Sequence, residues 1–296
     1  MSLSNFARPA LISLKNISIL KISLPDISTQ RKIATILSAY DDFIENNLRR
    51  IKILEEMAQN LYREWFVNFR FPGHEKVRMV DSPLGKIPEG WEVTGIMECP
   101  YIEIIRENIR PYPGMKIYYA TADVDGIQIS GKGIEFAYDD KPSRAQKQPE
   151  VNSVWFARMQ ETYKVIAFTN SNEPICRSCM LSSGFVGFRS SAGFAFPFLY
   201  YTINSEDFHR RKDQFCTGAT QRSLTNEGLS RIQIVVPLHA LVAKFGNIIE
   251  ANIDHILILF QKNRVLQTTR DLLLPKLISG EVDVSELDIT IPEVNA

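Results

Sequence analysis

The sequence predicts an α+β fold in which one mixed α/β domain is inserted between two long helices that pack as an antiparallel coiled coil. Three observations support this prediction. The chain contains an ungapped internal repeat, each copy carries a heptad pattern of apolar residues, and the segment between the copies consists of short apolar runs separated by turns. At 296 residues the chain is long enough to build such a domain and its core.

The overall composition excludes several classes of protein. With 34 basic and 34 acidic residues the chain has no net charge, so a nucleic-acid binder of this composition needs a local basic face. Four cysteines do not indicate a disulfide framework and suit the reducing cytoplasm. The N-terminus lacks the pattern of a signal peptide, and no apolar stretch reaches the length of a membrane-spanning helix. We therefore expect a soluble, cytoplasmic protein.

The internal repeat relates the beginning of the chain to its end. Residues 21–54 align with residues 233–266 without a gap. The offset is 212 residues, so Pro25 meets Pro237. Each copy consists of a short β-like run, a proline that ends it, and a long helical pattern. The repeat thus predicts two equivalent helices.

Both helical patterns carry a seam of residues in alternating steps of four and three, which is typical of a coiled coil. A long helix with a polar outer face needs a partner to cover such a seam. The seam of the first copy contains Ile33, Leu37, Ile44, Asn47, Ile51, Leu54 and Leu61. The seam of the second copy contains Ile249, Ile256, Leu259, Asn263, Leu266 and Leu273.

One asparagine in each seam predicts how the helices align. If they run antiparallel and facing residue numbers add up to 310, Asn47 faces Asn263. A shift of one heptad would place Asn47 against Ile256 or Arg270. An unpaired buried amide costs about 1–3 kcal/mol, so we expect the alignment that pairs the two asparagines. The alternative is that two unrelated amphipathic helices cover a common core.

The first helix ends in a group of four aromatic residues, Trp65, Phe66, Phe69 and Phe71. We expect these side chains to form the apolar seat where the helices meet the inserted domain. The Pro72-Gly73 pair and the prolines from Pro83 to Pro88 then redirect the chain into that domain.

The inserted segment, residues 91–236, has the pattern of an α+β domain. Its candidate strands are 115–122, 153–159, 164–169, 184–189 and 231–236, with a helix at 196–212. Residues 141–192 carry seven basic against three acidic residues, and a second basic group consists of Arg210, Arg211, Lys212 and Arg222. Polar and aromatic residues lie between these charges, so DNA or another phosphate ligand is a better interpretation of the clusters than solvated surface charge.

No catalytic motif accompanies the basic clusters. The sequence has no Gly-rich phosphate loop, no methyltransferase motif, no nuclease triad and no nucleophile elbow. Cys176 and Cys179 have the spacing of a metal knuckle, but a zinc site needs four ligands and no second pair follows. We therefore expect a binding protein without a catalytic site, a metal or a cofactor of its own.

Five stretches of the chain carry a family resemblance. They are LPDISTQRKIATILSAYDDFIE, REWFVNFRF, DSPLGKIPEGWEV, CTGATQRSLTNEGLSRIQIVVP and LLLPKLISGEVDV. In these residues the sequence resembles the specificity (S) subunit of type I restriction–modification systems, and the stretches occur in the order typical of that family.

In that family, two target-recognition domains each read half of a split DNA site, and two antiparallel helices space them and dock the methyltransferase subunits. The resemblance implies a DNA-binding, non-catalytic subunit of the restriction system that works with methyltransferase (M) and restriction/translocase (R) subunits. S-adenosylmethionine, ATP and Mg²⁺ would belong to those partners. The implied organisation is a remnant of a first recognition domain (1–26), a spacer helix (27–70), a linker (71–90), the target-recognition domain (91–236), a second spacer helix (237–280) and an acidic tail (281–296).

The resemblance also implies which residues lie at or near double-stranded DNA. They are Arg144, Lys147, Arg158, Thr162, Lys164, Arg177, Ser183, Thr220 and Gln221. Lysine and arginine would neutralise phosphates, and arginine, glutamine, serine or threonine would read base edges. For the GATQ stretch, residues 218–221, the alternative is a structural loop at the junction of the domain and the helix.

The chain departs from the family in one respect, because its first residues match the end of the inserted domain. We expect either a truncated form or a half-length subunit that restores two recognition domains as a homodimer. The competing interpretation of the whole chain is a non-catalytic coiled-coil scaffold or adaptor whose inserted domain binds protein.

Overall fold

The computed structural model describes residues 24–106 and 109–290. The chain divides into two compact units. Glu45–Arg264 forms the larger unit, and the described parts of Met1–Ile44 and Val265–Ala296 form the smaller one. The remnant of a first recognition domain, expected at residues 1–26, lies almost entirely outside the described residues.

Two long helices, α2 (Ile27–Tyr62) and α7 (His239–Ser279), correspond to the two copies of the repeat. Asp26 caps α2, since its carboxylate accepts hydrogen bonds from the amide and the hydroxyl of Thr29 at 3.0 and 2.8 Å. At its other end α2 continues into a π-helical turn, Arg63–Val67, so the helical backbone stops three residues before the expected end at residue 70. In the described part of the chain, no helix combines the length and hydrophobicity that crossing a bilayer requires.

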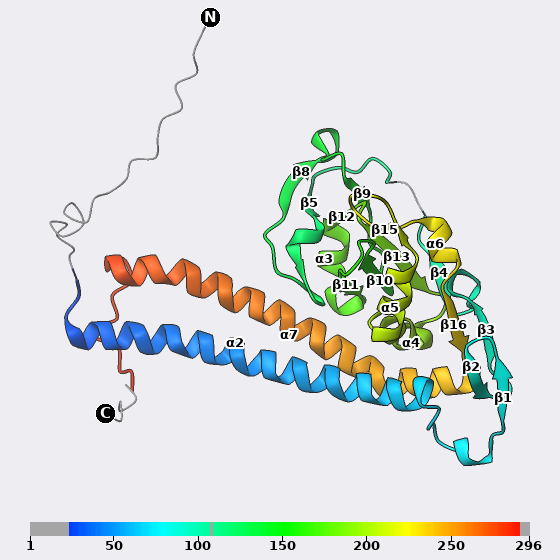
Figure 1. Cartoon of the computed structure of the whole chain (residues 1–296). Coiled ribbons are helices and arrows are strands. Elements are labelled where there is room, and N and C mark those ends of the chain that lie inside the picture. Colours follow the sequence, from blue (N-terminus) through cyan, green and yellow to red (C-terminus); the bar gives the residue numbers. More distant parts are fainter. Residues whose placement is uncertain (1–23, 107–108, 291–296) are drawn as a thin grey trace, which may run out of the picture. The chain divides into compact units, whose positions relative to one another are not determined.

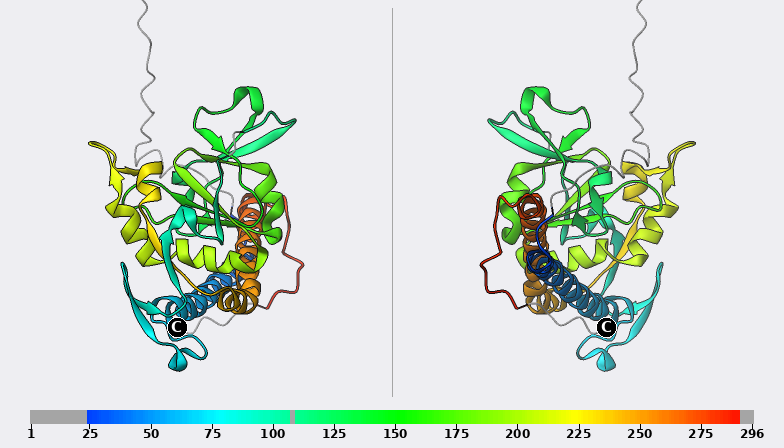
Figure 2. Two further views of the ribbon diagram at one scale, coloured as in Figure 1. Left: turned by 90° about the vertical axis from the view of Figure 1, so that its right-hand side faces the viewer. Right: turned by 90° about the vertical axis from the view of Figure 1, so that its left-hand side faces the viewer.

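Within the larger unit α2 and α7 run antiparallel, as Figures 1 and 2 show. The side-chain amide of Asn47 donates a hydrogen bond to the side-chain oxygen of Asn263 at 2.8 Å. Nearby, Ile51 packs with Ile256 and Leu259 in one apolar cluster. These contacts confirm the predicted pairing of the two asparagines, and Asn263 is buried with only 1% of its surface exposed.

The smaller unit follows the same alignment. Its buried apolar cluster consists of Ile33, Leu277 and Val284. The numbers of Ile33 and Leu277 again add up to 310, as the antiparallel alignment requires. An ion pair between Asp41 and Arg270 adds a second cross-helix contact. Paired seams, rather than two unrelated helices on a common core, therefore explain the repeat.

The inserted domain begins and ends on one two-stranded sheet. Strand β3 (Glu92–Gly95) pairs antiparallel with β16 (Gln233–Val236), which directly precedes Pro237 and α7. The expected linker before β3 contains regular structure, a hairpin of β1 (Met79–Ser82) and β2 (Gly85–Pro88). Because the first and last strands of the domain are paired, the chain leaves the domain close to the place where it entered.

Two four-stranded sheets form the body of the domain. The first has the order β11-β10-β13-β4 and is antiparallel throughout. Its strands are β4 (Ile102–Ile104), β10 (Ser153–Ala157), β11 (Val165–Phe168) and β13 (Phe185–Ser190). The second has the order β8-β5-β12-β9, in which β5 and β12 are parallel. Its strands are β5 (Met115–Tyr119), β8 (Ile134–Ala137), β9 (Ala145–Lys147) and β12 (Cys179–Ser182).

The segment 196–212, expected as one helix, forms two. They are α4 (Phe196–Ile203) and α5 (Glu206–Gln214). The break occurs at Ser205, whose hydroxyl caps α5 by accepting a hydrogen bond from the amide of Phe208 at 3.1 Å. Further short elements are β6 (Val124–Asp125), β7 (Gln128–Ile129), α3 (Glu173–Ser178), β14 (Cys216–Thr217), β15 (Ser223–Leu224) and α6 (Asn226–Ser230).

The aromatic residues at the end of α2 form the seat that the sequence predicts. The ring of Phe66 lies 5.2 Å from that of Phe198 in α4 and 5.1 Å from that of Phe245 in α7, between centroids. Phe71 stacks on Trp91 at the start of the domain, with centroids 5.3 Å apart. In the larger unit, both helices and the domain therefore share one hydrophobic core.

Specific polar contacts hold the domain against both helices in this unit. On α2, the buried carboxyl of Glu55 accepts a hydrogen bond from the hydroxyl of Tyr200 at 2.8 Å. Burial raises the pKa of Glu55 to about 7. On α7, Asp254 accepts a hydrogen bond from the hydroxyl of Thr169 at 2.8 Å. The orientation of the domain on this part of the helices is thus defined by directional contacts as well as by apolar packing.

Candidate nucleic-acid interface

Four segments of the domain meet at one end of the two sheets, which we call the loop end. They are residues 144–147, the β10–β11 connection (158–164), the β12–β13 turn (183–184) and the β14–β15 hairpin (216–224). The amide of Arg158 donates a hydrogen bond to the carbonyl of Gly184 at 2.9 Å. The amide of Ser183 donates to the carbonyl of Arg144 at 2.8 Å. Chain reversals from both sheets therefore form one continuous surface.

The β14–β15 hairpin lies along the β10–β11 connection. The amide of Gln160 donates to the carbonyl of Arg222 at 3.0 Å. At the exposed tip of the hairpin are Thr220 and Gln221. Gly218 makes this tip possible, because its φ is +127° and a Cβ there would lie 2.6 Å from the backbone oxygen of Gln221. The contact of Gln160 with Arg222 brings the hairpin that carries the GATQ stretch to the loop end, and the role of this stretch stays a prediction.

Four of the predicted DNA-binding cations lie in the loop end, namely Arg144, Lys147, Arg158 and Lys164. Arg158 also holds the hairpin, since its guanidinium donates to the carbonyl of Leu224 at 2.9 Å and to the side chain of Asn226 at 3.1 Å. Lys164 donates to a backbone carbonyl at 2.8 Å. Burial lowers the pKa of Lys147, and the nearby charge of Arg158 lowers it further. Two of these cations, Lys147 and Arg158, are therefore close to each other and partly desolvated.

Within the described part of the chain, none of these four cations has an acidic partner, in contrast to Arg177 and Arg189 of the same domain. Among residues 24–106 and 109–290, no carboxylate oxygen lies within the 4.0 Å of an ion pair from any of them. Elsewhere, Arg177 pairs with Glu173 at 2.5 Å and Arg189 pairs with Glu103 at 2.8 Å. The loop end is thus a local basic face in a chain without net charge.

Arg177 and the α5 members of the second basic group are not part of this face, whereas Arg222 lies in the hairpin. Arg177 lies in α3 before β12, whereas Ser183 follows β12, so the two residues are at opposite ends of that strand. Arg211 forms an ion pair with Asp207 at 2.7 Å. The side chain of Lys212 is completely buried, because α5 turns it toward the domain interior. The expectation of a basic surface cluster in this helix is therefore wrong for Lys212.

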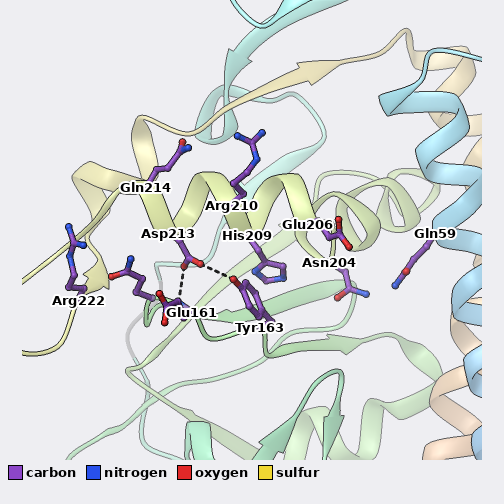
Figure 3. Close-up of a pocket in the computed structure, with 11 residues that line it drawn as sticks. Gln59, Glu161, Tyr163, Asn204, Glu206, His209, Arg210, Asp213, Gln214 and Arg222 are labelled. Atoms are coloured by element: carbon purple, nitrogen blue, oxygen red, sulfur yellow. Dashed lines mark hydrogen bonds between the residues drawn. The ribbon is translucent and has the colours of Figure 1, made fainter.

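A hollow of about 840 Å³ opens beside the loop end (Figure 3). One wall is the β10–β11 connection, with Gln160, Glu161 and Tyr163, and α5 contributes the other. Asp213 of α5 accepts hydrogen bonds from the amide of Glu161 at 3.1 Å and from the hydroxyl of Tyr163 at 3.2 Å. The predicted Thr162 lies in the same connection. Arg158, Thr162 and Lys164 of this connection were predicted from the sequence, whereas Gln160, Glu161 and Tyr163 were missed, although the polar run QETY between two apolar strands is a visible signal.

The cysteines and the acidic side chains do not form a reactive or metal-binding centre in the described residues. All four cysteines are free and buried. Burial raises the pKa of Cys176 to about 12, which disfavours its thiolate form. Within residues 24–106 and 109–290, no group of three or more His, Cys, Asp or Glu side chains is arranged to hold a metal ion.

Comparison with known proteins gives one consistent family. The family model of the type I restriction modification DNA specificity domain matches residues 3–56. The specificity subunit of the type I restriction enzyme MjaIX from Methanocaldococcus jannaschii is 26% identical over 286 residues, covering 90% of this chain and 62% of that subunit. The HindI specificity subunit from Haemophilus influenzae is 23% identical over 334 residues, covering 92% of this chain and 71% of that subunit.

Solved structures with similarity to the chain are also described as such subunits. The S subunit of a type I restriction–modification system from M. genitalium has 18% identity and a TM-score of 0.49, with 86% of this chain and 61% of that chain covered. The HsdS subunit from Thermoanaerobacter tengcongensis has 13% identity and a TM-score of 0.39, with 95% and 65% covered. The chain spans 62% of the length of the MjaIX subunit and 61% of the M. genitalium chain.

Proposed function

Since the chain belongs to the family of type I restriction–modification specificity subunits, we propose that it recognises a DNA sequence for such a complex and has no catalytic activity of its own. The domain between β3 and β16 would bind one half of a split site, and the helices would position a methyltransferase subunit over the target base. Base flipping and methyl transfer would take place in that partner. Four free thiols suit a cytoplasmic location.

The cations of the loop end that lack a carboxylate partner within the described residues carry this proposal. DNA presents a dense array of phosphates, and such cations can neutralise them without first breaking an ion pair. Lys147 and Arg158 are close enough for their charges to repel, so an anion bound between them would be stabilised. Next to them, Thr220 and Gln221 offer the hydrogen-bonding groups that read base edges.

The proposal predicts salt-dependent DNA binding through the loop end. In the complex with its M subunit, Arg144→Ala should weaken binding to all sequences and make the slope of log affinity against log salt shallower by about one. Arg177→Ala is the matched control, because it also removes one arginine but breaks only an exposed ion pair at the other end of β12. Unchanged affinity for Arg144→Ala, Lys147→Ala and Arg158→Ala alike would contradict the proposal.

A stripe of exposed apolar side chains supports the docking of a methyltransferase subunit on the helices. In the larger unit, Ile53 and Met57 of α2 are 55% and 60% exposed and lie one turn apart. Arg50, on the same face of α2, contacts His255 of α7 at 3.1 Å. Ile258, one turn beyond His255, is also exposed. Contiguous exposed apolar side chains of this kind are typical of protein interfaces.

A pair of substitutions tests this docking surface. Ile53→Ser combined with Met57→Ser should reduce co-purification with the M subunit, while the isolated chain keeps its unfolding transition. Leu48→Ser is the control, since Leu48 is 44% exposed but lies on the opposite face of α2. Full affinity of the double variant for the M subunit would refute docking at this stripe.

We also propose that two copies of the chain act together. One recognition domain reads one half of a split site, so a second copy would supply the other half. Light scattering of the complex with M subunits should count two copies of this chain. A complex with one copy that methylates a complete split site would rule out this part of the proposal.

A further inference from the structure

One lysine of α5 is completely enclosed by the domain. Lys212 is 0% exposed, and its ammonium donates to the carbonyls of Met159 at 2.7 Å and Thr162 at 3.1 Å. It also lies 3.0 Å from the carboxylate of Asp213. Burying an ammonium is unfavourable unless it is paired and hydrogen-bonded. Because two of its three acceptors belong to the β10–β11 connection, this buried charge defines the path of that loop.

Every residue of this loop from Met159 to Tyr163 is bonded to α5 or to the β14–β15 hairpin. Lys212 binds two of its carbonyls, and Asp213 accepts from the amide of Glu161 and the hydroxyl of Tyr163. On the other side, the amide of Gln160 donates to a hairpin carbonyl at 3.0 Å. Figure 3 shows the bonds of Asp213 to Glu161 and Tyr163. The loop is therefore rigid, although its side chains border a hollow.

The loop is also held in a conformation that a free chain avoids. Glu161 has a φ of +55°, in the left-handed region, which is unfavourable for a residue with a Cβ. Backbone strain of this kind persists only where surrounding contacts impose it, and it concentrates at functional sites. Here the imposing contact on Glu161 is the hydrogen bond from its amide to Asp213.

The side chains of the loop match base edges better than phosphates. Gln160 has the amide that pairs with adenine, and the carboxylate of Glu161 can accept from the amino group of cytosine. Tyr163 is 56% exposed and offers both a ring and a hydroxyl. Glu161 is exposed, and no cation lies within ion-pair distance of it among the described residues. Phosphates repel such a carboxylate, so its place beside the basic loop end favours a role in discrimination.

From these observations we propose that Gln160–Tyr163 is a specificity-determining element of the recognition domain and that Lys212 is its positioning residue. This inference rests on the proposed function, because it takes DNA as the ligand of the loop end. The buried cation touches no DNA. It determines which bases the loop can contact, whereas the surface cations determine how strongly phosphates are bound.

The test uses the full chain assembled with its M subunit and a library of random-sequence DNA, in which methylated sites report the base preference at each position. Lys212→Met keeps an unbranched side chain of similar length and removes the ammonium. We expect the discrimination between bases to fall by about 5- to 100-fold at one or two adjacent positions of the site. The salt dependence of non-specific binding should stay the same, because Lys212 neutralises no phosphate.

Two further variants test the loop without disturbing its anchor. Glu161→Gly removes the carboxylate, and glycine adopts a φ of +55° without strain. Gln160→Ala removes the amide. Both should change the base preference at the positions that Lys212→Met affects. Arg210→Ala is the matched control, since Arg210 lines the same hollow from α5 and is held in an ion pair with Asp207; its profile should equal that of the wild type.

The outcomes separate this inference from the proposed function. A wild-type complex that neither binds nor methylates DNA overturns both. A wild-type complex that methylates a defined site, with an unchanged profile for Gln160→Ala and Glu161→Gly, overturns the inference alone. If a melting curve shows that Lys212→Met is unfolded, Asp213→Ala is the substitute variant. It removes the hydrogen bonds that hold Glu161 and Tyr163 and lies at a more exposed position than Lys212. An unaltered profile for that variant removes the positioning role.

Discussion

The hydrogen bond between Asn47 and Asn263 gives a direct test of how α2 and α7 pair. Asn47→Leu removes the donor that the side-chain oxygen of Asn263 accepts at 2.8 Å, and Asn263 is only 1% exposed. A buried polar group that loses its partner costs about 1–3 kcal/mol. Position 47 is half-buried, so the added leucine surface returns roughly 1 kcal/mol at most. We expect the free energy of unfolding to fall by about 1–2 kcal/mol.

The double variant makes the test specific to the pair. Asn47→Leu with Asn263→Leu replaces both amides by an apolar pair, so it should be more stable than either single variant by about 1–2 kcal/mol. Urea denaturation followed by circular dichroism measures all four proteins of this double-mutant cycle. Asn46→Leu, on the exposed face of α2, is the control and should change stability by less than about 0.5 kcal/mol. Single losses that simply add within about 0.5 kcal/mol would refute the pairing of the two amides.

Three other predictions concern the buried acid, the hairpin and its anchor. Burial raises the pKa of Glu55 from 4.5 to about 7, so its contribution to stability is complete below pH 4.5 and is lost as the pH rises through 7. Glu55→Gln should therefore be more stable than the wild type by up to about 3 kcal/mol near pH 8 and similar to it near pH 4. Urea titrations at both pH values measure this difference, and equal stability near pH 8 would contradict the raised pKa of a buried Glu55. Gly218→Ala should weaken specific DNA binding several-fold in an anisotropy titration, because a Cβ would lie 2.6 Å from the carbonyl oxygen of Gln221; wild-type affinity would mean that the tip does not contact DNA. Arg158→Ala removes one hydrogen bond to the last residue of the hairpin and one to α6 directly after it, so limited proteolysis should cut the hairpin faster than in Arg144→Ala. Equal cleavage rates would show that Arg158 is not the anchor.

The pairing of the two helices could be predicted from the sequence alone. Apolar residues at heptad spacing place one face of each helix in a seam, and a single alignment sets Asn47 opposite Asn263. The aromatic seat could also be predicted, because Phe66 and Phe71 come where a long helical pattern stops at a proline and a glycine. Both features depend on the spacing of residues within one segment of the chain, and this spacing is visible in the sequence.

The composition of the loop end could not be predicted from the sequence, because it depends on how the strands are arranged in the fold. Arg144 and Arg158 share a surface because the chain reversals of two sheets meet, whereas Arg177 is excluded by its place before β12. Lys212 looks like a surface cation in the run Arg210–Lys212, yet its ammonium binds carbonyls 50 and 53 residues earlier in the chain. Whether a charged side chain is buried depends on acceptors that other elements bring to it, and such long-range acceptors leave no pattern in the neighbouring sequence.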